Sequence, residues 1–293
     1  MADPLTDAGA GALTAPRPPA FDFVVEAGKV AEFARATGAD PASAADLAPV
    51  TFPAASALWM KPENSAWHGI DRDYRHVLHG EQRFDYHDGP LPVGIVLRAR
   101  QRFGRTFEKT GRRGVMTFTE VVTRFWTTDE AEPLAEMTSL SITLPSPAGE
   151  RTEPRGEGGS ASVDAPARPQ TAVASSLVSD ETPPLTITDF VKYQGASGDF
   201  NPIHHDADFA RAAGYPSPFA VGMLTAGLAA ARIAKVRDVQ RLRTFRARWQ
   251  SQAWPGDRLR FVIGPRDTAT DAVDATVTRA GGDVHMLAWA DFA

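Results

Sequence analysis

Hydrophobic residues follow a helical period early in the chain and a strand-like period later. Residues 25–37 have small or apolar side chains at helical spacing, and Gly38 supplies a stop. The positions that form this stripe are Val30, Phe33, Ala34 and Thr37. From Glu81 onward the pattern becomes extended, and residues 115–126 are rich in β-branched and aromatic residues. The first half therefore predicts a short amphipathic helix followed by a sheet.

The second half predicts the same order of elements. Thr188 is a candidate N-cap for a helix over 189–196 that breaks at Gly198, and another short helix is expected over 206–213. Residues 222–236 are small or apolar on nearly every face, which is typical of a helix enclosed by other structure. Strands are expected over 242–250, 258–266, 271–279 and 284–292. One buried helix with several strands indicates an α+β unit.

The turn residues indicate that the two halves are copies of one unit. The segment that starts at Phe33 aligns with the one that starts at Tyr193, and an aromatic, a small hydroxyl residue, a glycine and a proline coincide. The offset is 160 residues at the start and 162 at the later turn glycines, Gly94 and Gly256. A nearly constant offset favours a diverged duplication. We therefore expect a double hotdog, with a curved antiparallel sheet around a central helix in each unit.

A segment poor in large apolar residues separates the halves. Pro, Gly, Ser, Glu and Arg dominate residues 145–170, which is typical of a flexible linker. The expected organisation is a flexible tail over 1–20, an N-terminal unit over 21–145, a linker over 146–175 and a C-terminal unit over 176–293.

Composition narrows the functional classes. The 293 residues suit two domains, and a 43% hydrophobic and 23% charged content suits a globular chain. A net charge of −5 gives no general attraction to nucleic acid or anionic lipid, so neither partner is expected. The absence of cysteine excludes disulfides, thiolate nucleophiles and cysteine-ligated metals. The first twenty residues lack the pattern of a secretion signal, and the longest apolar run, 219–231, is too short to span a bilayer, so we expect a cytoplasmic protein.

The most informative segment is residues 193–209, YQGASGDFNPIHHDADF. It places Asp199 and His204 five residues apart across a turn that Gly198 and Asn201 help to make rigid, so the two side chains can converge on one small volume. Such a pair suits the addition of water to an activated double bond, because it can orient the water and transfer its proton. The alternative is a purely structural turn, in which Asp199 caps the loop and His204 is a satisfied polar residue. We prefer the catalytic interpretation.

This segment resembles the hydratase signature of the MaoC-like dehydratase family, the (R)-specific enoyl-thioester hydratases. In that signature an aromatic and small residues precede Gly-Asp-x-Asn-Pro-x-His, and every position is matched. The family fold is the hotdog, and its members reversibly hydrate trans-2-enoyl thioesters of CoA or acyl-carrier protein to (R)-3-hydroxyacyl thioesters. The resemblance implies that Asp199 and His204 are the catalytic dyad, that Asn201 assists in the same loop, and that no metal or redox cofactor is needed.

Hydration also requires a donor for the thioester oxygen, where negative charge develops. Backbone N–H groups at a helix N-terminus suit this role, and the start of the buried helix at Gly222 and Met223 is the candidate substrate-binding element. In the family this stretch commonly reads His-Gly-Met, with the glycine amide as the oxyanion donor. Here Val221 replaces the histidine. The Gly222 amide survives the change, but any hydrogen bond from the usual histidine is lost, which bears on rate or chain-length preference.

The first half carries a second resemblance. Its motifs are Thr51-Phe52-Pro53, His79-Gly80-Glu81-Gln82 and Phe84-Asp85-Tyr86. They resemble the N-terminal FAS1-like dehydratase domain that accompanies MaoC-like halves in two-hotdog enzymes. Ala39 aligns with Asp199 and no histidine follows Pro41 at the required distance, so one active site per chain is expected, with this half shaping the acyl pocket. His79 could substitute for the histidine missing at Val221, although a structural role at a strand start is favoured.

Several other residues have both a functional and a structural interpretation. His205 and Asp206 adjoin His204, but neighbouring histidines point apart and Asp206 suits an N-cap, so no metal is expected. Arginines over 98–113 and 232–248 could bind the phosphates of CoA or an acidic carrier protein, although solvated strand faces commonly carry arginine. The aromatic residues expected only to pack are Tyr193, Phe209, Trp249 and Trp254.

We therefore expect a hydro-lyase that interconverts trans-2-enoyl and 3-hydroxyacyl thioesters in fatty-acid or related acyl metabolism. Its partner is an acyl-CoA or acyl-carrier-protein thioester. Two alternatives stay open. A hotdog thioesterase would use the same pocket but release free thiol, and a non-catalytic thioester-binding or accessory subunit would bind enoyl-CoA without turnover. The sequence leaves the acyl chain and the formation of a homodimer open.

Overall fold

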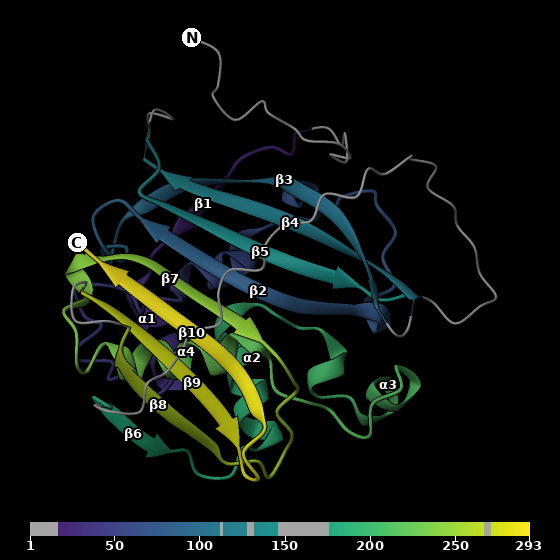
Figure 1. The fold of residues 1–293 in the computed structure, drawn as a ribbon. Coiled ribbons are helices and arrows are strands. Elements are labelled where there is room, and N and C mark those ends of the chain that lie inside the picture. Colours follow the sequence, from purple (N-terminus) through teal and green to yellow (C-terminus); the bar gives the residue numbers. More distant parts are fainter. Residues whose placement is uncertain (1–16, 112–113, 128–131, 146–175, 267–270) are drawn as a thin grey trace.

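The computed structural model describes residues 17–111, 114–127, 132–145, 176–266 and 271–293. The expected linker over 146–175 and most of the expected N-terminal tail lie outside these residues. The described strands form one ten-stranded antiparallel sheet, in which two five-stranded halves meet where β2 (Val77–Tyr86) pairs with β7 (Leu242–Trp249) (Figure 1). No described helix is long and apolar enough to cross a membrane.

The first half begins with a strand and a helix and continues through short 3-10 helices into four strands. Its elements are β1 (Phe21–Val24), α1 (Ala27–Ala36), η1 (Phe52–Trp59), η2 (Pro62–Asn64), η3 (Tyr74–His76), β2, β3 (Val96–Gly111), β4 (Gly114–Trp126) and β5 (Ala135–Thr143). The predicted helix over 25–37 corresponds to α1, which Glu26 caps by accepting hydrogen bonds from two backbone N–H groups. The extended pattern over 115–126 corresponds to β4.

The second half has the same plan with longer helices. Its elements are β6 (Val178–Glu181), α2 (Ile187–Ser197), η5 (Pro202–His204), α3 (Ala207–Ala212), α4 (Gly222–Ile233), η6 (Val239–Arg241), β7, β8 (Leu259–Pro265), β9 (Ala272–Arg279) and β10 (Val284–Phe292). The four predicted strands are confirmed within one or two residues at each end. The predicted N-cap of α2 was wrong, because Thr186 and not Thr188 caps the helix. The Thr186 hydroxyl accepts a hydrogen bond from Asp189 N–H, and the Asp189 carboxylate accepts one from Thr186 N–H.

The two halves repeat one sheet topology. From each outer edge to the joint, the strand order is β1-β3-β4-β5-β2 in one half and β6-β8-β9-β10-β7 in the other. The aligned aromatics Phe33 and Tyr193 face each other between α1 and α2, with ring centroids 5.6 Å apart. The predicted α+β double hotdog is thereby confirmed. The halves differ in the segment between their first helix and their four strands, which contains the α-helices α3 and α4 in the second half and the 3-10 helices η1, η2 and η3 in the described residues of the first.

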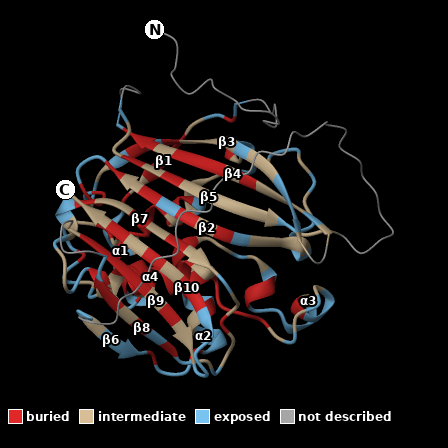
Figure 2. Ribbon diagram, viewed as in Figure 1, coloured by how far each residue is buried: buried red, intermediate tan, exposed pale blue. Residues whose placement is uncertain are grey.

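One hydrophobic core extends through both halves. Figure 2 shows buried residues along α4 and along the strand faces that pack against it. Small residues let α4 approach its neighbours closely: a Cβ on Gly227 would lie 2.5 Å from Cγ2 of Thr37, at the end of α1. This contact between the halves explains why the sequence of α4 is rich in alanine and glycine. The predicted helix over 222–236 ends earlier, at Ile233.

Ion pairs reinforce the joint between β2 and β7. The half-buried carboxylate of Glu81 accepts hydrogen bonds from Arg246 at 2.5 Å and from Arg248 at 2.6 Å. Four residues further along β2, Asp85 accepts a hydrogen bond from the Thr244 hydroxyl at 2.8 Å. The joint is therefore held by side chains as well as by the backbone ladder, and it keeps the first half in register with the helices of the second.

Candidate active site

The candidate dyad lies in the loop after α2. The loop begins at Gly198, which takes a left-handed φ of 80° and donates its N–H to the Gln194 carbonyl at 2.8 Å. A Cβ at Gly198 would lie 3.0 Å from the backbone nitrogen of Leu58 in η1. Glycine is required here both for the backbone conformation and for this close approach. The first half of the chain therefore packs directly against the start of the loop that carries the candidate dyad.

Asn201 holds the loop in shape. Its N–H donates to Asp199 Oδ1 at 3.3 Å, and its own side-chain oxygen accepts from Ile203 N–H at 3.2 Å. Gln194 donates to the Asn201 carbonyl at 3.0 Å. The side chain of Asn201 therefore fixes the loop, while its backbone N–H contacts the Asp199 carboxylate. The side chain of Asp199 is partly accessible, as a group that handles water should be. The substrate-binding role of Asn201 stays a prediction.

His204 is held as a neutral base. Its side chain is 8% exposed, and Nδ1 lies 2.8 Å from the Phe219 carbonyl oxygen. Because a carbonyl only accepts, Nδ1 carries the proton and donates, which leaves the lone pair on Nε2. Burial lowers the pKa of His204, and the charge of Asp199 acts on it in the opposite direction. A neutral imidazole beside a carboxylate can accept a proton from water near neutral pH.

Three residues beyond Phe219, the chain enters α4 at Gly222. The N-cap residue Val221 has no side-chain hydrogen bond to the helix, and among the described residues no acceptor takes the Gly222 N–H. The indole N–H of Trp249 donates to the Gly222 carbonyl at 3.1 Å. A Cβ on Gly222 would lie 2.9 Å from Trp249 Cε2. This glycine therefore allows Trp249 to pack closely against a helix terminus whose first N–H groups are available.

A buried polar network supports that terminus, and the sequence analysis missed it. His285 is 2% exposed, with Nδ1 2.6 Å from the Ser251 carbonyl and Nε2 3.0 Å from the hydroxyl of Thr225. The same hydroxyl lies 3.1 Å from Trp249 Nε1 and 2.8 Å from the Gly222 carbonyl. Burial lowers the pKa of His285 to about 4, so it is neutral at pH 7. No local pattern could have indicated a network whose members come from α4, β7 and β10.

His79, for which a structural role was favoured, lies against Trp249. It lies in β2 at a β-bulge, where the register with β5 shifts between His79 and Glu81. Its ring centroid is 4.5 Å from that of Trp249. The side chain is accessible to solvent, yet desolvation by the surrounding protein lowers its pKa to about 4. The charge of Asp199 acts on this pKa in the opposite direction, and that of His204 lowers it further.

Other predicted residues have structural contacts. Met223 is buried in the core, so a contact between its side chain and substrate stays a prediction. His205 points away from His204, as expected, with Nδ1 2.9 Å from the side-chain oxygen of Gln194. Asp206 caps α3 by accepting from two backbone N–H groups, which confirms its predicted role. The described residues contain no cluster of three or more side chains suited to a metal ion.

Many of the candidate phosphate-binding arginines are paired with acidic side chains. These pairs are Arg98–Asp22, Arg105–Glu120, Arg232–Asp180, Arg237–Asp271, Arg241–Asp271, Arg243–Asp88, Arg246–Glu81 and Arg248–Glu81. Arg113 lies outside the described residues. Ion pairing reduces the charge that each of these arginines could offer to a phosphate, so their role in CoA binding stays a prediction.

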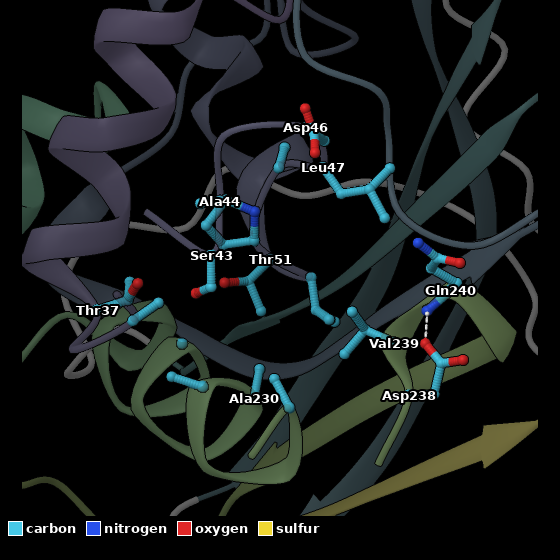
Figure 3. A pocket seen from close by; sticks show the side chains of 17 residues that line it. Thr37, Ser43, Ala44, Asp46, Leu47, Thr51, Ala230, Asp238, Val239 and Gln240 are labelled. Atoms are coloured by element: carbon cyan, nitrogen blue, oxygen red, sulfur yellow. Dashed lines mark hydrogen bonds between the residues drawn. The ribbon is translucent and has the colours of Figure 1, made fainter. Parts of the chain in front are cut away.

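A cavity of about 240 Å³ lies at the other end of α4 (Figure 3). The loop over residues 39–51 lines one side, and Gly227, Ala230 and Ala234 line the helix side. Figure 3 shows Ala230 on α4 beneath Thr51 and Ser43 from the first half. Asp199, His204 and Gly222 are not among the residues that line it. The cavity is thus built by both halves and is separate from the dyad.

Family models match both halves of the chain. Residues 169–283 match the model described as MaoC like domain, and residues 17–137 match the FAS1-like, dehydratase domain region. Among curated proteins, enoyl-CoA hydratase ChsH3 of Mycobacterium tuberculosis is 28% identical over 206 residues, or 68% of this chain. The match spans 64% of that relative, which is less than two thirds of its length.

Solved structures share the fold over nearly the whole chain. A MaoC-like dehydratase from Phytophthora capsici superposes with a TM-score of 0.72 at 20% identity, covering 96% of both chains. A Mycobacterium tuberculosis protein described as having a double hotdog fold gives a TM-score of 0.59 at 12% identity, covering 94% of this chain and 96% of the other. At such low identity the likeness establishes the fold alone.

Proposed function

Because this chain belongs to the MaoC-like dehydratases, with a FAS1-like dehydratase region ahead of its MaoC-like domain, we propose that it is an (R)-specific hydratase. Its substrates would be trans-2-enoyl thioesters of CoA or of acyl-carrier protein, and its products the 3-hydroxyacyl thioesters. The relation to an enoyl-CoA hydratase supports this reaction class. The (R) configuration follows from the resemblance of the Gly-Asp-x-Asn-Pro-x-His segment to the family signature.

The observation that carries the proposal is the state of His204. Its Nδ1 is committed to the Phe219 carbonyl, and Asp199 acts on the buried ring. The remaining nitrogen can therefore only accept a proton. Phe219 leads within three residues to Gly222, so the base and the available helix terminus are connected by a short segment. A base that is hydrogen-bonded three residues before the candidate oxyanion donor suits the addition of water to an enoyl thioester.

In the proposed mechanism, Asp199 and His204 hold one water molecule between them. The water adds as hydroxide to C3 of the enoyl group, and its other proton passes through the dyad to C2. Negative charge develops on the thioester oxygen as the C3–O bond forms, and the Gly222 N–H stabilises it by donating a hydrogen bond. Removal of one such donor typically costs about 2.7–4 kcal/mol of transition-state stabilisation. Dehydration follows the same steps in reverse.

The first half would shape the site for the acyl chain. From Gly222 to Gly227 the helix rises by roughly 7.5 Å, at 1.5 Å per residue. An acyl chain directed along α4 would thus approach the cavity that residues 39–51 line together with Gly227 and Ala230. This arrangement agrees with the expectation that the half without a dyad determines which acyl chains fit.

Product analysis tests the proposal. Purified protein is mixed with crotonyl-CoA, and loss of the enoyl absorbance is followed together with free thiol. Hydration predicts that absorbance is lost without thiol release and that chiral analysis identifies the (R)-3-hydroxy product. Thiol release at a matching rate would instead identify a thioesterase. Binding without turnover across a series of enoyl chain lengths would identify a non-catalytic thioester-binding protein. Either of these two results would overturn the proposal.

A further inference from the structure

The first turn of α4 packs on a polar network in which side-chain donors and their acceptors are equal in number. The oxygen and nitrogen acceptors are the Ser251 carbonyl, the Gly222 carbonyl and Nε2 of His285. The donors are Nδ1 of His285, the indole N–H of Trp249 and the hydroxyl of Thr225. Thr225 and His285 are buried, so bulk water does not replace their partners. Each proton is therefore matched with an acceptor inside the protein.

The tautomer of His285 determines where the other protons point. Nδ1 lies 2.6 Å from the Ser251 carbonyl, which only accepts, so a neutral ring carries its proton there and has a lone pair on Nε2. The Thr225 hydroxyl lies 3.0 Å from Nε2 and donates its single proton to this lone pair. That proton is then not available to the Gly222 carbonyl, although it lies only 2.8 Å from the hydroxyl. The indole N–H of Trp249, at 3.1 Å, is the side-chain donor left for this carbonyl.

This order of protons restrains a glycine that has little else to hold it. Gly222 has no side chain, and the N-cap residue Val221 makes no side-chain hydrogen bond to the helix. The indole of Trp249 contacts Gly222 in two ways. It donates to the carbonyl, and it packs beside the α-carbon, where a Cβ would lie 2.9 Å from Cε2. Together these contacts limit rotation of the Gly222 backbone and so set the direction of its N–H.

We propose that Thr225 and His285 are positioning residues, which keep the Trp249 indole on the Gly222 carbonyl and thereby orient the Gly222 N–H towards the thioester oxygen. This inference rests on the proposed function. Both side chains are buried, and they act through Trp249 and Gly222 without contacting the substrate. Their effect is largest in the transition state, where the thioester oxygen is most negative. Loss of either group should therefore lower kcat and change KM little.

Two substitutions at Thr225 separate the hydroxyl from packing. Thr225→Val keeps the branched shape and removes the hydroxyl, whereas Thr225→Ser keeps the hydroxyl and removes a methyl group. We expect Thr225→Val to lower kcat for crotonyl-CoA roughly tenfold with KM within about twofold, because a misdirected donor stabilises the transition state less. Thr225→Ser should recover most of this loss. A larger loss in Thr225→Ser than in Thr225→Val would assign the effect to packing and overturn the inference.

The matched control is Thr182→Val, at a buried threonine remote from α4 in the sequence. The Thr182 hydroxyl accepts from Leu259 N–H at 3.0 Å, and the side chain is 5% exposed. This variant should lower the temperature of unfolding and keep kcat, because it removes a buried hydrogen bond without altering the network behind Gly222. A tenfold fall in kcat for Thr182→Val as well would show that kcat follows stability, which would contradict the positioning role.

His285→Asn tests the network from its other end, and it carries the test if Thr225→Val does not fold. Asparagine keeps a donor for the Ser251 carbonyl and lacks the acceptor at the Nε2 position. The Thr225 hydroxyl is then free to turn to the Gly222 carbonyl, so kcat should fall about as much as in Thr225→Val. The double variant should lose no more than either single variant, since both break one chain of contacts. Full activity of His285→Asn, or additive losses in the double variant, would overturn the inference.

A bound ligand that does not react gives a readout independent of turnover. Butyryl-CoA is labelled isotopically at the thioester carbonyl, and difference infrared spectroscopy measures the carbonyl stretch of the bound ligand. Stronger donation to the oxygen lowers the frequency, so we expect a higher frequency in Thr225→Val than in wild-type protein and no change in Thr182→Val. Equal frequencies in wild-type protein and Thr225→Val would overturn the inference even if the protein hydrates crotonyl-CoA. If wild-type protein hydrates no enoyl-CoA, the proposed function fails, and the carbonyl frequencies still decide the inference. Absence of butyryl-CoA binding as well would overturn both.

Discussion

The two halves of the molecule share a helix that ends at a left-handed glycine, and they diverge one residue later. In the first half Gly38 has a φ of 70° and leads to Asp40, whose carboxylate accepts from Ala42 N–H at 3.0 Å and so caps a tight turn. In the second half Gly198 has a φ of 80° and leads to Asp199, beside the buried His204. The same backbone turn therefore serves structure in one half and candidate chemistry in the other.

The difference extends to the central element. Between its first helix and its four strands, the second half has the twelve-residue helix α4, whose N-terminus offers backbone donors, whereas the described residues of the first half have 3-10 helices there, the longest being the eight-residue η1. Without a histidine after its turn and without that helix, the first half has neither the base nor the oxyanion donor. What it contributes to the second half is packing at Leu58 against Gly198, the contact of His79 with Trp249, and one wall of the cavity beside α4.

The largest effect we predict in this series concerns the α4 terminus. Gly222→Ala should lower kcat roughly 100-fold, because its Cβ would lie 2.9 Å from Trp249 Cε2 and displace the indole that holds the terminus. The control is Gly195→Ala in α2, where the nearest atom to a Cβ is 4.0 Å away; it should leave kcat unchanged. Steady-state hydration kinetics of the two variants provide the measurement. Equal activity of both would show that the terminus plays no part in the reaction.

The joint between the halves should be the next most sensitive region. Glu81→Gln removes the charge that pairs with Arg246 and Arg248, and we expect it to lower the free energy of unfolding by roughly 2 kcal/mol. Glu136→Gln removes the partner of one arginine inside the first half, where the pair is more exposed, and should cost less than about 1 kcal/mol. Urea denaturation of both variants measures the difference. A larger loss for Glu136→Gln would contradict the importance assigned to the joint.

The contact between α1 and α4 gives a smaller predicted effect on stability, which a second substitution should cancel or reverse. Gly227→Ala introduces a Cβ 2.5 Å from Cγ2 of Thr37. Overpacking of this kind costs about 1–3 kcal/mol, whereas alanine stabilises the helix by about 1 kcal/mol relative to glycine. We therefore expect the free energy of unfolding to fall by about 1 kcal/mol. Thr37→Ser removes that methyl group and keeps the hydroxyl that donates to Phe33. In the Thr37→Ser background, Gly227→Ala should therefore be neutral or stabilising. Thermal unfolding of the wild type, the two single variants and the double variant completes the cycle. If the two substitutions had additive effects on stability, the contact would be ruled out.

The smallest predicted effect is on how the free energy of unfolding depends on pH. His285 has a folded pKa of about 4 and an unfolded value of about 6.5, so between these values only the unfolded chain binds the proton. The stability that neutral His285 contributes is complete above pH 6.5 and is lost as the pH falls towards 4. Replacement of His285 by Gln should flatten this part of the stability profile without affecting the region above pH 7. An identical slope in the variant would assign the pH dependence to other groups.

Local patterns in the sequence were sufficient for much of the fold and for part of the site. Period and turn residues located many of the helices and strands, and the spacing of Asp199 and His204 around a rigid turn predicted the candidate dyad. The pattern could not show that η1 replaces a full central helix in the first half, since tertiary packing decides between helix types. Nor could it bring His79 or His285 to the site, because their contacts cross between strands and halves of the chain.

The most direct test of the account compares the two aspartates that follow the two glycine turns. Asp199→Asn and Asp40→Asn are assayed for hydration of crotonyl-CoA, and circular dichroism and thermal unfolding verify that both fold. We predict that Asp199→Asn lowers kcat/KM by roughly 10³-fold or more and that Asp40→Asn leaves it unchanged. Full activity of a folded Asp199→Asn variant, or an equal loss in Asp40→Asn, would contradict the claim that one half alone carries the chemistry.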